Sequence, residues 1–296
     1  MQGIDLTAIS TETITLPIDQ KKNIETSILR LDKIHPFISG NKSFKLRYYL
    51  EEAKRLRKGT ILTFGGAWSN HILATAAACK LEQFKSTGII RGEEPPVYSL
   101  VLKQALEMGM KLCFISRDDF SKQKVPVELV NDDSYLIPQG GFGPLGAKGA
   151  ADILNYTDKE KYSHICCAAG TGTMMSGLIM AASSSQKIVG VSVLKNNLQL
   201  QEHIRELTGE ARNNYDIVHE YHLGGYAKHN EELIDFMNEF YRKTIVPTDI
   251  VYTGKLCFAI ANLIQKNFFP QGSRVLIIHS GGLTGNASLE KGTLIF

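Results

Sequence analysis

The 296-residue sequence predicts an α/β protein with two open, twisted, mostly parallel sheets flanked by helices. Two observations carry this prediction. Short apolar runs alternate with helical segments along the chain, and several of those runs end in glycine-rich turns. Strands that read as continuous apolar runs and alternate with helices are typical of parallel sheets that are covered on both faces.

The predicted elements follow a rhythm of strand, turn and helix. In the first half of the chain we predict a helix that begins near residue 41, strands at 60–64, 86–92 and 111–116, and helices at 68–81 and 99–109. In the second half we predict strands at 163–170, 187–194 and 274–282, a helix that follows the first of them, and an amphipathic helix at 231–243. Adjacent Cys166 and Cys167 lie in one of the apolar runs and are expected to be buried thiols.

These elements predict two units. Residues 51–150 are expected to form a smaller domain, and residues 1–50 and 151–296 a larger one. The carboxyl ends of parallel strands are where ligands bind in open α/β sheets, so the expected site is a cleft between the two domains.

Composition excludes several classes of function. A net charge of +3 with scattered basic residues argues against a nucleic-acid partner. No apolar stretch approaches the roughly 18 residues that span a bilayer, and the N-terminus lacks the pattern of a signal peptide. Five cysteines without metal-ligand spacing fit a reducing cytoplasm. The only tight cluster of metal-ligand types, His219, Glu220 and His222, lacks the helical HExxH spacing, so no metal site is expected.

Glycine-rich turns follow four predicted strand ends, with the sequences GGAWSNH, AAGTGTMMSG, VYTGK and HSGGLTG. The strongest is Gly170-Thr171-Gly172-Thr173, between a buried strand and a helix. Backbone amides that stand free at a helix start form an anion site, although a simple connector is the alternative. A dinucleotide site is disfavoured because Met175 occupies the place of the third glycine and no acid follows the next strand. Two threonine hydroxyls beside bare amides suit a phosphate monoester.

Two lysines follow a predicted turn in the segment SGNKSFKL. Asn41 is expected to cap the helix that continues through Leu46 and Leu50. The helix dipole and the nearby Lys45 cation both lower the pKa of Lys42, which makes its amine a better nucleophile toward an aldehyde. An exposed helix start is the alternative. Together with a phosphate site, a reactive lysine suggests pyridoxal phosphate.

At this point the chain resembles a known family. The segments SGNKSFKLRYYL, FGGAWSNH, RGEEP, YLIPQGGFGPLGAKG, AAGTGT, GGYAK, VYTGK and IHSGGLTG occur in the order of the 1-aminocyclopropane-1-carboxylate deaminase / D-cysteine desulfhydrase family. The resemblance covers about residues 28–285. It implies a tryptophan-synthase-β-like fold, the cofactor pyridoxal 5'-phosphate, a small amino-acid substrate and a homodimer.

The resemblance also implies roles for individual residues. The residues that would contact the cofactor are Lys42 (Schiff base), Lys45 and Gly170, Thr171, Gly172 and Thr173 (phosphate), Asn70 (ring hydroxyl), Tyr252 (ring face) and Thr253 (pyridine nitrogen). The residues that would contact the substrate are Ser69, Asn70 and His71 (carboxylate), Trp68, Tyr226 and Ser280. The residues with an implied catalytic role are Lys42, Ser69, Tyr226 and Tyr252.

Three departures bear on the substrate. Cyclopropane-ring deaminases resemble YEGK where this chain has Thr253, and they tend to have Leu in place of Ser280; the desulfhydrase branch tends to have Thr at both positions. Both differences favour the desulfhydrase side. Trp68 stands where the family usually has Gln, either as a buried core residue or as a bulky group that reshapes the substrate pocket.

The sequence therefore predicts a lyase that converts D-cysteine to pyruvate, ammonia and sulfide. Lys42 is the expected base, and Tyr226 or Tyr252 could assist with the leaving group. The first alternative is the deaminase that converts 1-aminocyclopropane-1-carboxylate to 2-oxobutyrate and ammonia. The second is a non-catalytic protein that binds a phosphorylated ligand in the same cleft.

Overall fold

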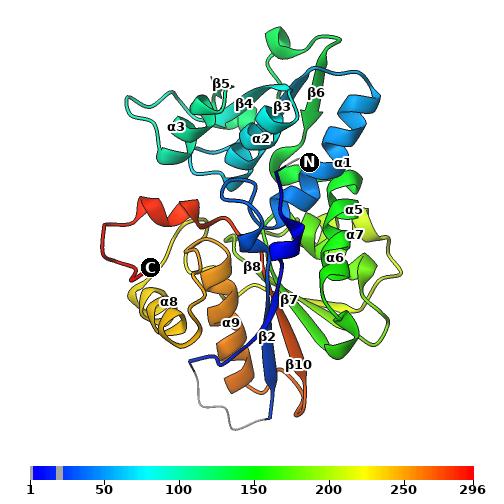
Figure 1. Ribbon diagram of the computed structural model, residues 1–296, viewed down its shortest axis with the longest axis vertical. Coiled ribbons are helices and arrows are strands. Elements are labelled where there is room, and N and C mark those ends of the chain that lie inside the picture. Colours follow the sequence, from blue (N-terminus) through cyan, green and yellow to red (C-terminus); the bar gives the residue numbers. More distant parts are fainter. Residues whose placement is uncertain (1–2, 18–22) are drawn as a thin grey trace.

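The computed structural model describes residues 3–17 and 23–296. Within them the chain forms two separate, mostly parallel sheets with helices on their faces (Figure 1). The six-stranded sheet has the order β1-β2-β10-β7-β8-β9, and the four-stranded sheet has the order β5-β4-β3-β6. The predicted fold class is confirmed.

The larger sheet is assembled from both ends of the chain. Its strands are β1 (Thr11–Ile14), β2 (Glu25–Arg30), β10 (Arg274–His279), β7 (His164–Ala169), β8 (Lys187–Ser192) and β9 (Tyr215–Val218). Within this sheet β1 pairs antiparallel with β2, and the other strand pairs are parallel. The smaller sheet is parallel throughout and comprises β5 (Met110–Ile115), β4 (Lys85–Arg91), β3 (Thr60–Gly65) and β6 (Ser134–Ile137).

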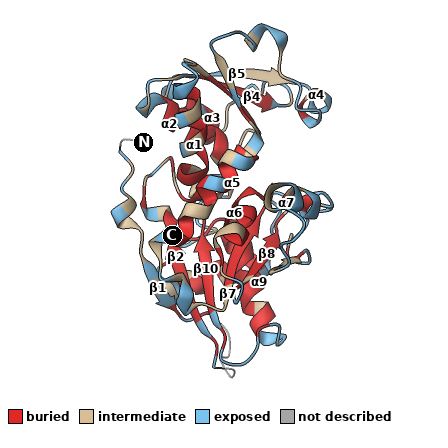
Figure 2. Cartoon of the chain, turned by 90° about the vertical axis from the view of Figure 1, so that its right-hand side faces the viewer, coloured by how far each residue is buried: buried red, intermediate tan, exposed pale blue. Residues whose placement is uncertain are grey.

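Strand β10 shows why the larger sheet reads as continuous apolar runs. Val275 and Ile277 face a core shared with α8 (Glu231–Thr244) and α9 (Thr253–Gln265). Leu276 and Ile278 face the opposite core, shared with α6 (Thr173–Ala181) and α7 (Leu200–Thr208). Because successive side chains of a strand point to opposite faces, a strand that is covered twice needs apolar residues at every position. Figure 2 shows β10, β7 and β8 as buried.

The neighbouring cysteines on β7 follow the same rule. Cys166 packs in the first core and Cys167 in the second, and both are fully buried. This confirms the prediction that they are buried thiols. Burial raises the pKa of the Cys167 thiol to about 12 and raises the pKa of the Cys166 thiol well above its ordinary value.

Helices also cover both faces of the smaller sheet. On one face lie α1 (Asn41–Arg55), α2 (Asn70–Leu81) and α3 (Leu100–Glu107). On the other face Phe120 of α4 (Arg117–Ser121) packs against Phe64 and Ile89. The remaining helix, α5 (Pro144–Ala151), packs against α1 so closely that a Cβ atom at Gly149 would lie 2.0 Å from the carbonyl oxygen of Phe44.

Both predicted domain boundaries fall inside these packed helices, at residue 50 in α1 and residue 150 in α5. All four strands of the smaller sheet lie between Thr60 and Ile137. The division into 1–50 with 151–296 and 51–150 remains our proposal.

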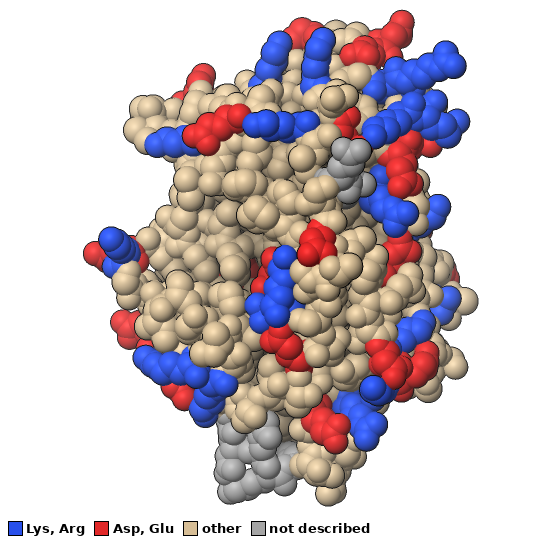
Figure 3. All heavy atoms as spheres, in the orientation of Figure 1, with Lys and Arg blue, Asp and Glu red and all other residues tan. Residues whose placement is uncertain are grey.

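Short 3₁₀ helices complete the described elements, at Leu6–Ala8, Leu31–Lys33, Val127–Leu129, Gln139–Gly141, Asp152–Tyr156, Lys159–Lys161 and Leu283–Ser288. None of the helices formed by residues 3–17 and 23–296 has the length and apolar character needed to cross a membrane. On the face shown in Figure 3, Lys and Arg side chains lie among Asp and Glu side chains.

One prediction about a turn is wrong. The segment VYTGK does not follow a strand: residues 245–252 are irregular, and the segment leads into α9 at Thr253. The physical reason is the carboxylate of Asp249, which accepts hydrogen bonds from the backbone N–H groups of Val251, Tyr252 and Thr253. A segment whose backbone N–H groups bind a nearby carboxylate in this way cannot also pair as a β-strand.

Candidate functional site

A cavity of about 330 Å³ lies where loops from both sheets meet. Its walls come from the ends of β3, β4, β7 and β10, from the starts of α1, α2 and α6, and from loop residues such as Gln139 and Tyr226. The parallel strands of both sheets thus direct their carboxyl ends toward one cavity, as expected for a ligand site in such folds.

The start of α1 differs from the predicted one. Gly40, not Asn41, occupies the N-cap position, with φ 64° and ψ −141°. A Cβ atom there would lie 1.7 Å from the carbonyl oxygen of Ser280, which accepts the Asn41 N–H at 3.1 Å. Asn41 is therefore the first helical residue, and its side chain donates to Met174 Sδ (3.1 Å) and accepts from Lys42 Nζ (2.7 Å).

The two lysines of this helix have different surroundings. Burial lowers the pKa of Lys42 to about 8, although the Asp249 carboxylate opposes that change. Burial and the Lys42 cation together lower the pKa of Lys45 well below its ordinary value. Lys45 Nζ donates to the carbonyl oxygen of Gly140 at 2.7 Å. A lysine with a pKa about 8 offers a sizeable fraction of free amine at neutral pH.

The pH dependence of aldehyde capture tests this assignment. Because only the free amine attacks an aldehyde, capture of pyridoxal phosphate by the cofactor-free protein should rise with pH and reach half its limit near pH 8, where Lys42 loses its proton. Stopped-flow absorbance across pH 6 to about 10.5 measures this rate. A midpoint near the ordinary lysine value of about 10.4 would contradict it.

The predicted phosphate cradle is the loop between β7 and α6. Gly172 has φ 87°, and the hydroxyls of Thr171 and Thr173 lie 2.9 Å apart. Asn197 Nδ2 donates to the Gly170 carbonyl oxygen at 2.9 Å and fixes the loop from behind. The first N–H groups of α6 have no acceptor within the helix, and the positive end of the helix dipole lies at this loop. This arrangement fits a phosphate monoester.

The start of α2 joins the two sheets. Ser69 is its N-cap, and Ser69 Oγ accepts from Ile72 N at 3.3 Å. Asn70 Nδ2 donates to the Gly282 carbonyl oxygen at 2.9 Å, and Asn70 Oδ1 accepts from the Thr284 hydroxyl. Asn70 thus connects the loop after β3 with the loop after β10, and both loops contribute to the cavity wall.

His71 contributes a defined acceptor. The Thr63 hydroxyl donates to the Ile137 carbonyl oxygen (2.8 Å), so it accepts the proton that His71 carries on Nε2 (2.9 Å). Burial, with the cations of Lys42 and Lys45, holds the pKa of His71 well below its ordinary value and keeps the ring neutral. His71 lines the cavity, and its Nδ1 atom is then a buried acceptor without a hydrogen-bond partner. An N–H or O–H group of a bound molecule can donate to it.

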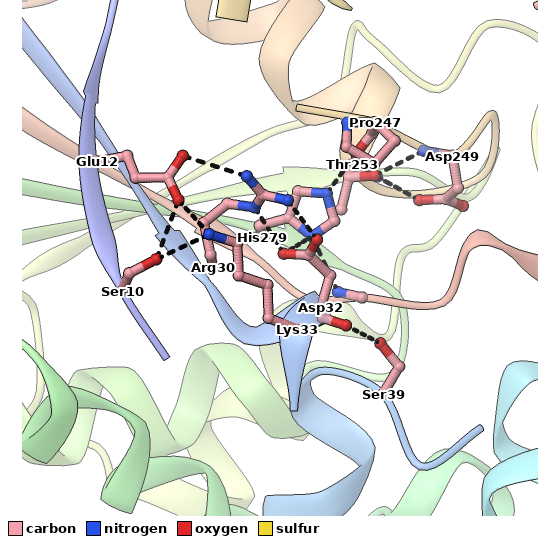
Figure 4. Close-up of polar contacts among 11 residues, drawn as sticks. Ser10, Glu12, Arg30, Asp32, Lys33, Ser39, Pro247, Asp249, Thr253 and His279 are labelled. Atoms are coloured by element: carbon pink, nitrogen blue, oxygen red, sulfur yellow. Dashed lines mark hydrogen bonds and ion pairs between the residues drawn. The ribbon is translucent and has the colours of Figure 1, made fainter. Parts of the chain in front are cut away.

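Asp249, which lies outside the cavity lining, and Arg91, which is part of it, are charged residues that the sequence reasoning missed. Asp249 is the more deeply enclosed. Its carboxylate is fully buried, and besides the three N–H groups it accepts the Thr253 hydroxyl at 2.7 Å. Asp249 N donates to the same hydroxyl at 2.8 Å, as Figure 4 shows for this pair. An acidic residue four positions before a helix start is the signal that could have found it, because such residues cap exposed N–H groups.

Two tyrosines face each other in the cavity wall. The rings of Tyr226 and Tyr252 meet edge to face, with centroids 6.4 Å apart, and Lys42 Nζ lies 5.9 Å from the Tyr252 centroid. Desolvation in the cavity wall and the Asp249 carboxylate raise the pKa of Tyr226 although this residue is partly exposed, and burial, Tyr226 and Asp249 raise the pKa of Tyr252 well above its ordinary value. Both phenols are therefore proton donors at neutral pH, not bases.

Ion pairs join the strands that end around Arg30 and His279 (Figure 4). Arg30 binds Asp32 through two hydrogen bonds of 2.8 and 2.7 Å and pairs with Glu12 at 3.2 Å. His279, the last residue of β10, lies 3.3 Å from Asp32 and hydrogen-bonds the Pro247 carbonyl oxygen at 2.7 Å. These contacts tie β1, β2 and β10 together immediately before the loop that meets Gly40.

Most of the predicted site residues line this cavity. They are Lys42, Lys45, Ser69, Asn70, His71, Gly170, Thr171, Gly172, Thr173, Tyr226, Tyr252 and Ser280. Trp68 and Thr253 do not line it: Trp68 is half-buried beside it, and Thr253 is buried behind Tyr252. The lining includes the cations Lys42, Lys45 and Arg91 and neither Asp nor Glu, within the part of the chain that the structure describes. Over the same residues, no group of three His, Cys, Asp or Glu side chains is placed to hold a metal ion.

Comparison with known proteins gives a consistent result. Residues 4–281 match the family model described as pyridoxal-phosphate dependent enzyme. A bifunctional D-cysteine desulfhydrase/1-aminocyclopropane-1-carboxylate deaminase of Arabidopsis thaliana is 30% identical over 282 residues, which cover 84% of this chain and 70% of that protein. A putative 1-aminocyclopropane-1-carboxylate deaminase of Pyrococcus horikoshii is 26% identical, covering 84% and 81%.

The solved structures agree. The crystal structure of a homologue of 1-aminocyclopropane-1-carboxylate deaminase superposes with a TM-score of 0.82 at 26% identity, covering 97% of this chain and 92% of that one. A fungal L-serine ammonia-lyase from Rhizomucor miehei shares the fold alone, with a TM-score of 0.63 at 13% identity.

Proposed function

The chain belongs to the pyridoxal-phosphate-dependent enzymes of the 1-aminocyclopropane-1-carboxylate deaminase and D-cysteine desulfhydrase family, and from this premise we propose that it converts D-cysteine and water to pyruvate, ammonia and sulfide. Because this is a family of enzymes, the alternative of a non-catalytic protein that binds a phosphorylated ligand is not supported. The residues of the cavity suit the cofactor: a lysine with a lowered pKa, a phosphate cradle and a buried acceptor without a partner.

The observation that carries the proposal is the pairing of a base with an acid in one wall. Lys42 Nζ lies 5.9 Å from the ring of Tyr252, and the raised pKa of Tyr252 keeps its phenol protonated. An elimination needs a base for the α-proton and an acid for the departing thiolate. In this proposal Lys42 takes the proton and Tyr252 protonates the sulfur.

The remaining residues bind and orient. When bound, pyridoxal phosphate supplies an electron-accepting ring that makes the α-proton of an amino acid removable. The loop from Gly170 to Thr173 holds its phosphate, with Lys45 nearby, and Asn70 holds the ring. Thr253, whose hydroxyl is bonded to Asp249 outside the cavity lining, acts on the ring only from behind that lining. The amides at the start of α2 and Ser69 bind the substrate carboxylate, and His71 Nδ1 accepts a hydrogen bond from the bound molecule.

A specific observation supports the alternative deaminase. Asp249 accepts the Thr253 hydroxyl at 2.7 Å, so a carboxylate is in direct contact with the position where cyclopropane-ring deaminases have their own carboxylate. That charge would help a substrate without a good leaving group. In this second candidate function 1-aminocyclopropane-1-carboxylate gives 2-oxobutyrate and ammonia.

One assay separates the two. The purified, cofactor-loaded protein is offered D-cysteine, L-cysteine and 1-aminocyclopropane-1-carboxylate separately, and keto acid and sulfide are measured against the Lys42→Ala variant as a blank. We expect pyruvate and sulfide in equal amounts from D-cysteine and no product from the cyclopropane. 2-Oxobutyrate from the cyclopropane would favour the deaminase, and product from neither substrate would contradict both.

The same proposal includes a homodimer in the cytoplasm. The family resemblance supports the dimer, and the five free cysteines support a reducing compartment.

A further inference from the structure

Lys255 is a buried charge that the reaction described above does not use. Its side chain is fully buried, and it lies in the first turn of α9, two residues after Thr253. A cation near a helix N-terminus is disfavoured by the helix dipole, and burial adds a second cost. Burial lowers the pKa of Lys255 to about 8, while the nearby Asp249 carboxylate acts in the opposite direction. A lysine in such a position persists only if favourable contacts of its ammonium offset these costs.

The ammonium binds one loop at two points. Lys255 Nζ donates to the carbonyl oxygen of His222 at 2.8 Å and to that of Gly225 at 2.7 Å. Each of these carbonyls also closes a turn, since His222 O accepts from Gly225 N (2.9 Å) and Gly225 O accepts from Lys228 N (3.2 Å). Two consecutive turns of the loop at residues 219–230 are therefore fixed by a single side chain.

The loop needs this support because its backbone is unfavourable. Leu223, Gly224, Gly225 and Ala227 have φ values of 50°, 95°, 117° and 55°. Left-handed conformations at non-glycine residues such as Leu223 and Ala227 persist only where surrounding contacts impose them. Tyr226, the residue between these positions, is the one whose side chain reaches the cavity.

Tyr226 also bridges to the opposite wall. Its hydroxyl donates to the backbone carbonyl of Trp68 at 3.3 Å, in the loop that precedes α2, and its ring meets Tyr252 edge to face. Lys255 and Tyr252 lie within one turn of the same helix. One buried ammonium thus ties the loop of Tyr226 to the helix start that presents Tyr252.

We propose that Lys255 is a positioning residue, whose buried ammonium holds the loop at 219–230 so that Tyr226 closes one side of the cavity against Trp68 and Tyr252. It acts on the substrate through Tyr226 and touches no reacting atom. The kinetic arm of the test rests on the proposed D-cysteine reaction; the fluorescence arm does not.

The chain offers a built-in reporter, because Trp68 is its only tryptophan. In the cofactor-loaded protein, Lys255→Met removes the ammonium at nearly constant length and should free the loop. We expect acrylamide to quench Trp68 fluorescence more strongly in this variant than in the parent. The control is Lys243→Met on α8, an exposed lysine that pairs with Glu239 at 3.6 Å, and it should behave as the parent does. Equal quenching in all three proteins would overturn the proposal.

The kinetic arm asks whether Lys255 acts through Tyr226. Misplacement of a positioning group by about 1 Å costs up to about a hundredfold, so we expect kcat/KM for D-cysteine to fall by up to that factor in Lys255→Met, with the visible absorbance of lysine-bound cofactor retained. In a Tyr226→Ala background the same change should cost little more. Equal losses in the two backgrounds would show that Lys255 acts independently of Tyr226 and would overturn the proposal.

A second variant covers the case in which Lys255→Met does not fold. Gly225→Ala strains the same loop at φ 117° while leaving the lysine in place, and it should give the same quenching and kinetic changes. Parent-like quenching in Gly225→Ala would count against the proposal. If D-cysteine is not turned over at all, the proposed function fails, and the quenching comparison still decides the role of Lys255.

Discussion

Replacing Lys42 by alanine is expected to lower turnover of the cofactor-loaded enzyme by at least about a thousandfold, because both the covalent attachment of the cofactor and the proposed base are removed. The fold should survive. Lys42 Nζ donates to the side chain of its neighbour Asn41, and deleting this partly buried cation relieves a desolvation cost. Circular dichroism and thermal unfolding check the fold, and keto-acid release checks turnover.

Lys45→Ala is the matched control. The same substitution one turn further along α1 removes a cation whose ammonium binds Gly140 O, and it should mainly weaken cofactor binding. At saturating pyridoxal phosphate Lys45→Ala should therefore regain much of its turnover, whereas Lys42→Ala should not. Full activity in Lys42→Ala would sink the assignment of the reactive lysine.

Gly40→Ala is expected to destabilise the protein by more than about 3 kcal/mol. The new Cβ would meet the carbonyl oxygen of Ser280 at 1.7 Å, and the backbone at φ 64° and ψ −141° is one that alanine avoids. The start of α1 would have to move away from the loop after β10, and Lys42 would move with it. Urea unfolding at constant temperature measures the loss, and cofactor capture should fall in parallel.

Gly209→Ala is the control that separates the cost of backbone strain from the cost of a steric clash. Gly209 has φ 79° and ψ 160°, also a region reserved for glycine, and a Cβ there would meet nothing within 4 Å. It should cost about 1–3 kcal/mol, the strain alone. If both variants lose the same free energy of unfolding, the contact between Gly40 and Ser280 contributes nothing to stability.

The apolar strands were predictable because double coverage leaves a plain pattern in the sequence. Strands β3, β4, β5, β7, β8 and β10 were placed within a few residues. Strand β2 was missed although it lies inside the larger sheet, since its first three residues are polar, and β1, β6 and β9 were missed as well. Each of those three has four residues, and they lie at sheet edges. A short strand with one neighbour can carry polar residues, so its sequence resembles that of a loop.

The site likewise has features that follow from local sequence and features that depend on tertiary contacts. Glycine-rich turns between a strand and a helix depend on local sequence, so the turn at Gly170–Thr173 could be predicted from the chain alone. Gly40 replaced Asn41 as the cap because a distant carbonyl, that of Ser280, comes within contact of it. Asp249 and Lys255 were missed because their burial depends on tertiary packing, and a charged side chain in a sequence is normally read as exposed.

The order of strands in the larger sheet has a consequence for how the chain folds during synthesis. The smaller sheet draws its strands from residues 60–137, so it can form as soon as that stretch has left the ribosome. Strand β10, which pairs with both β2 and β7, emerges after all the other described strands. Until then β2 and β7 each expose an open edge, and the pocket around Lys42 lacks the wall supplied by Ser280 and Gly281. The nascent protein therefore depends on protection of those edges, and the pocket around Lys42 is completed only after β10 and the loop that follows it have emerged.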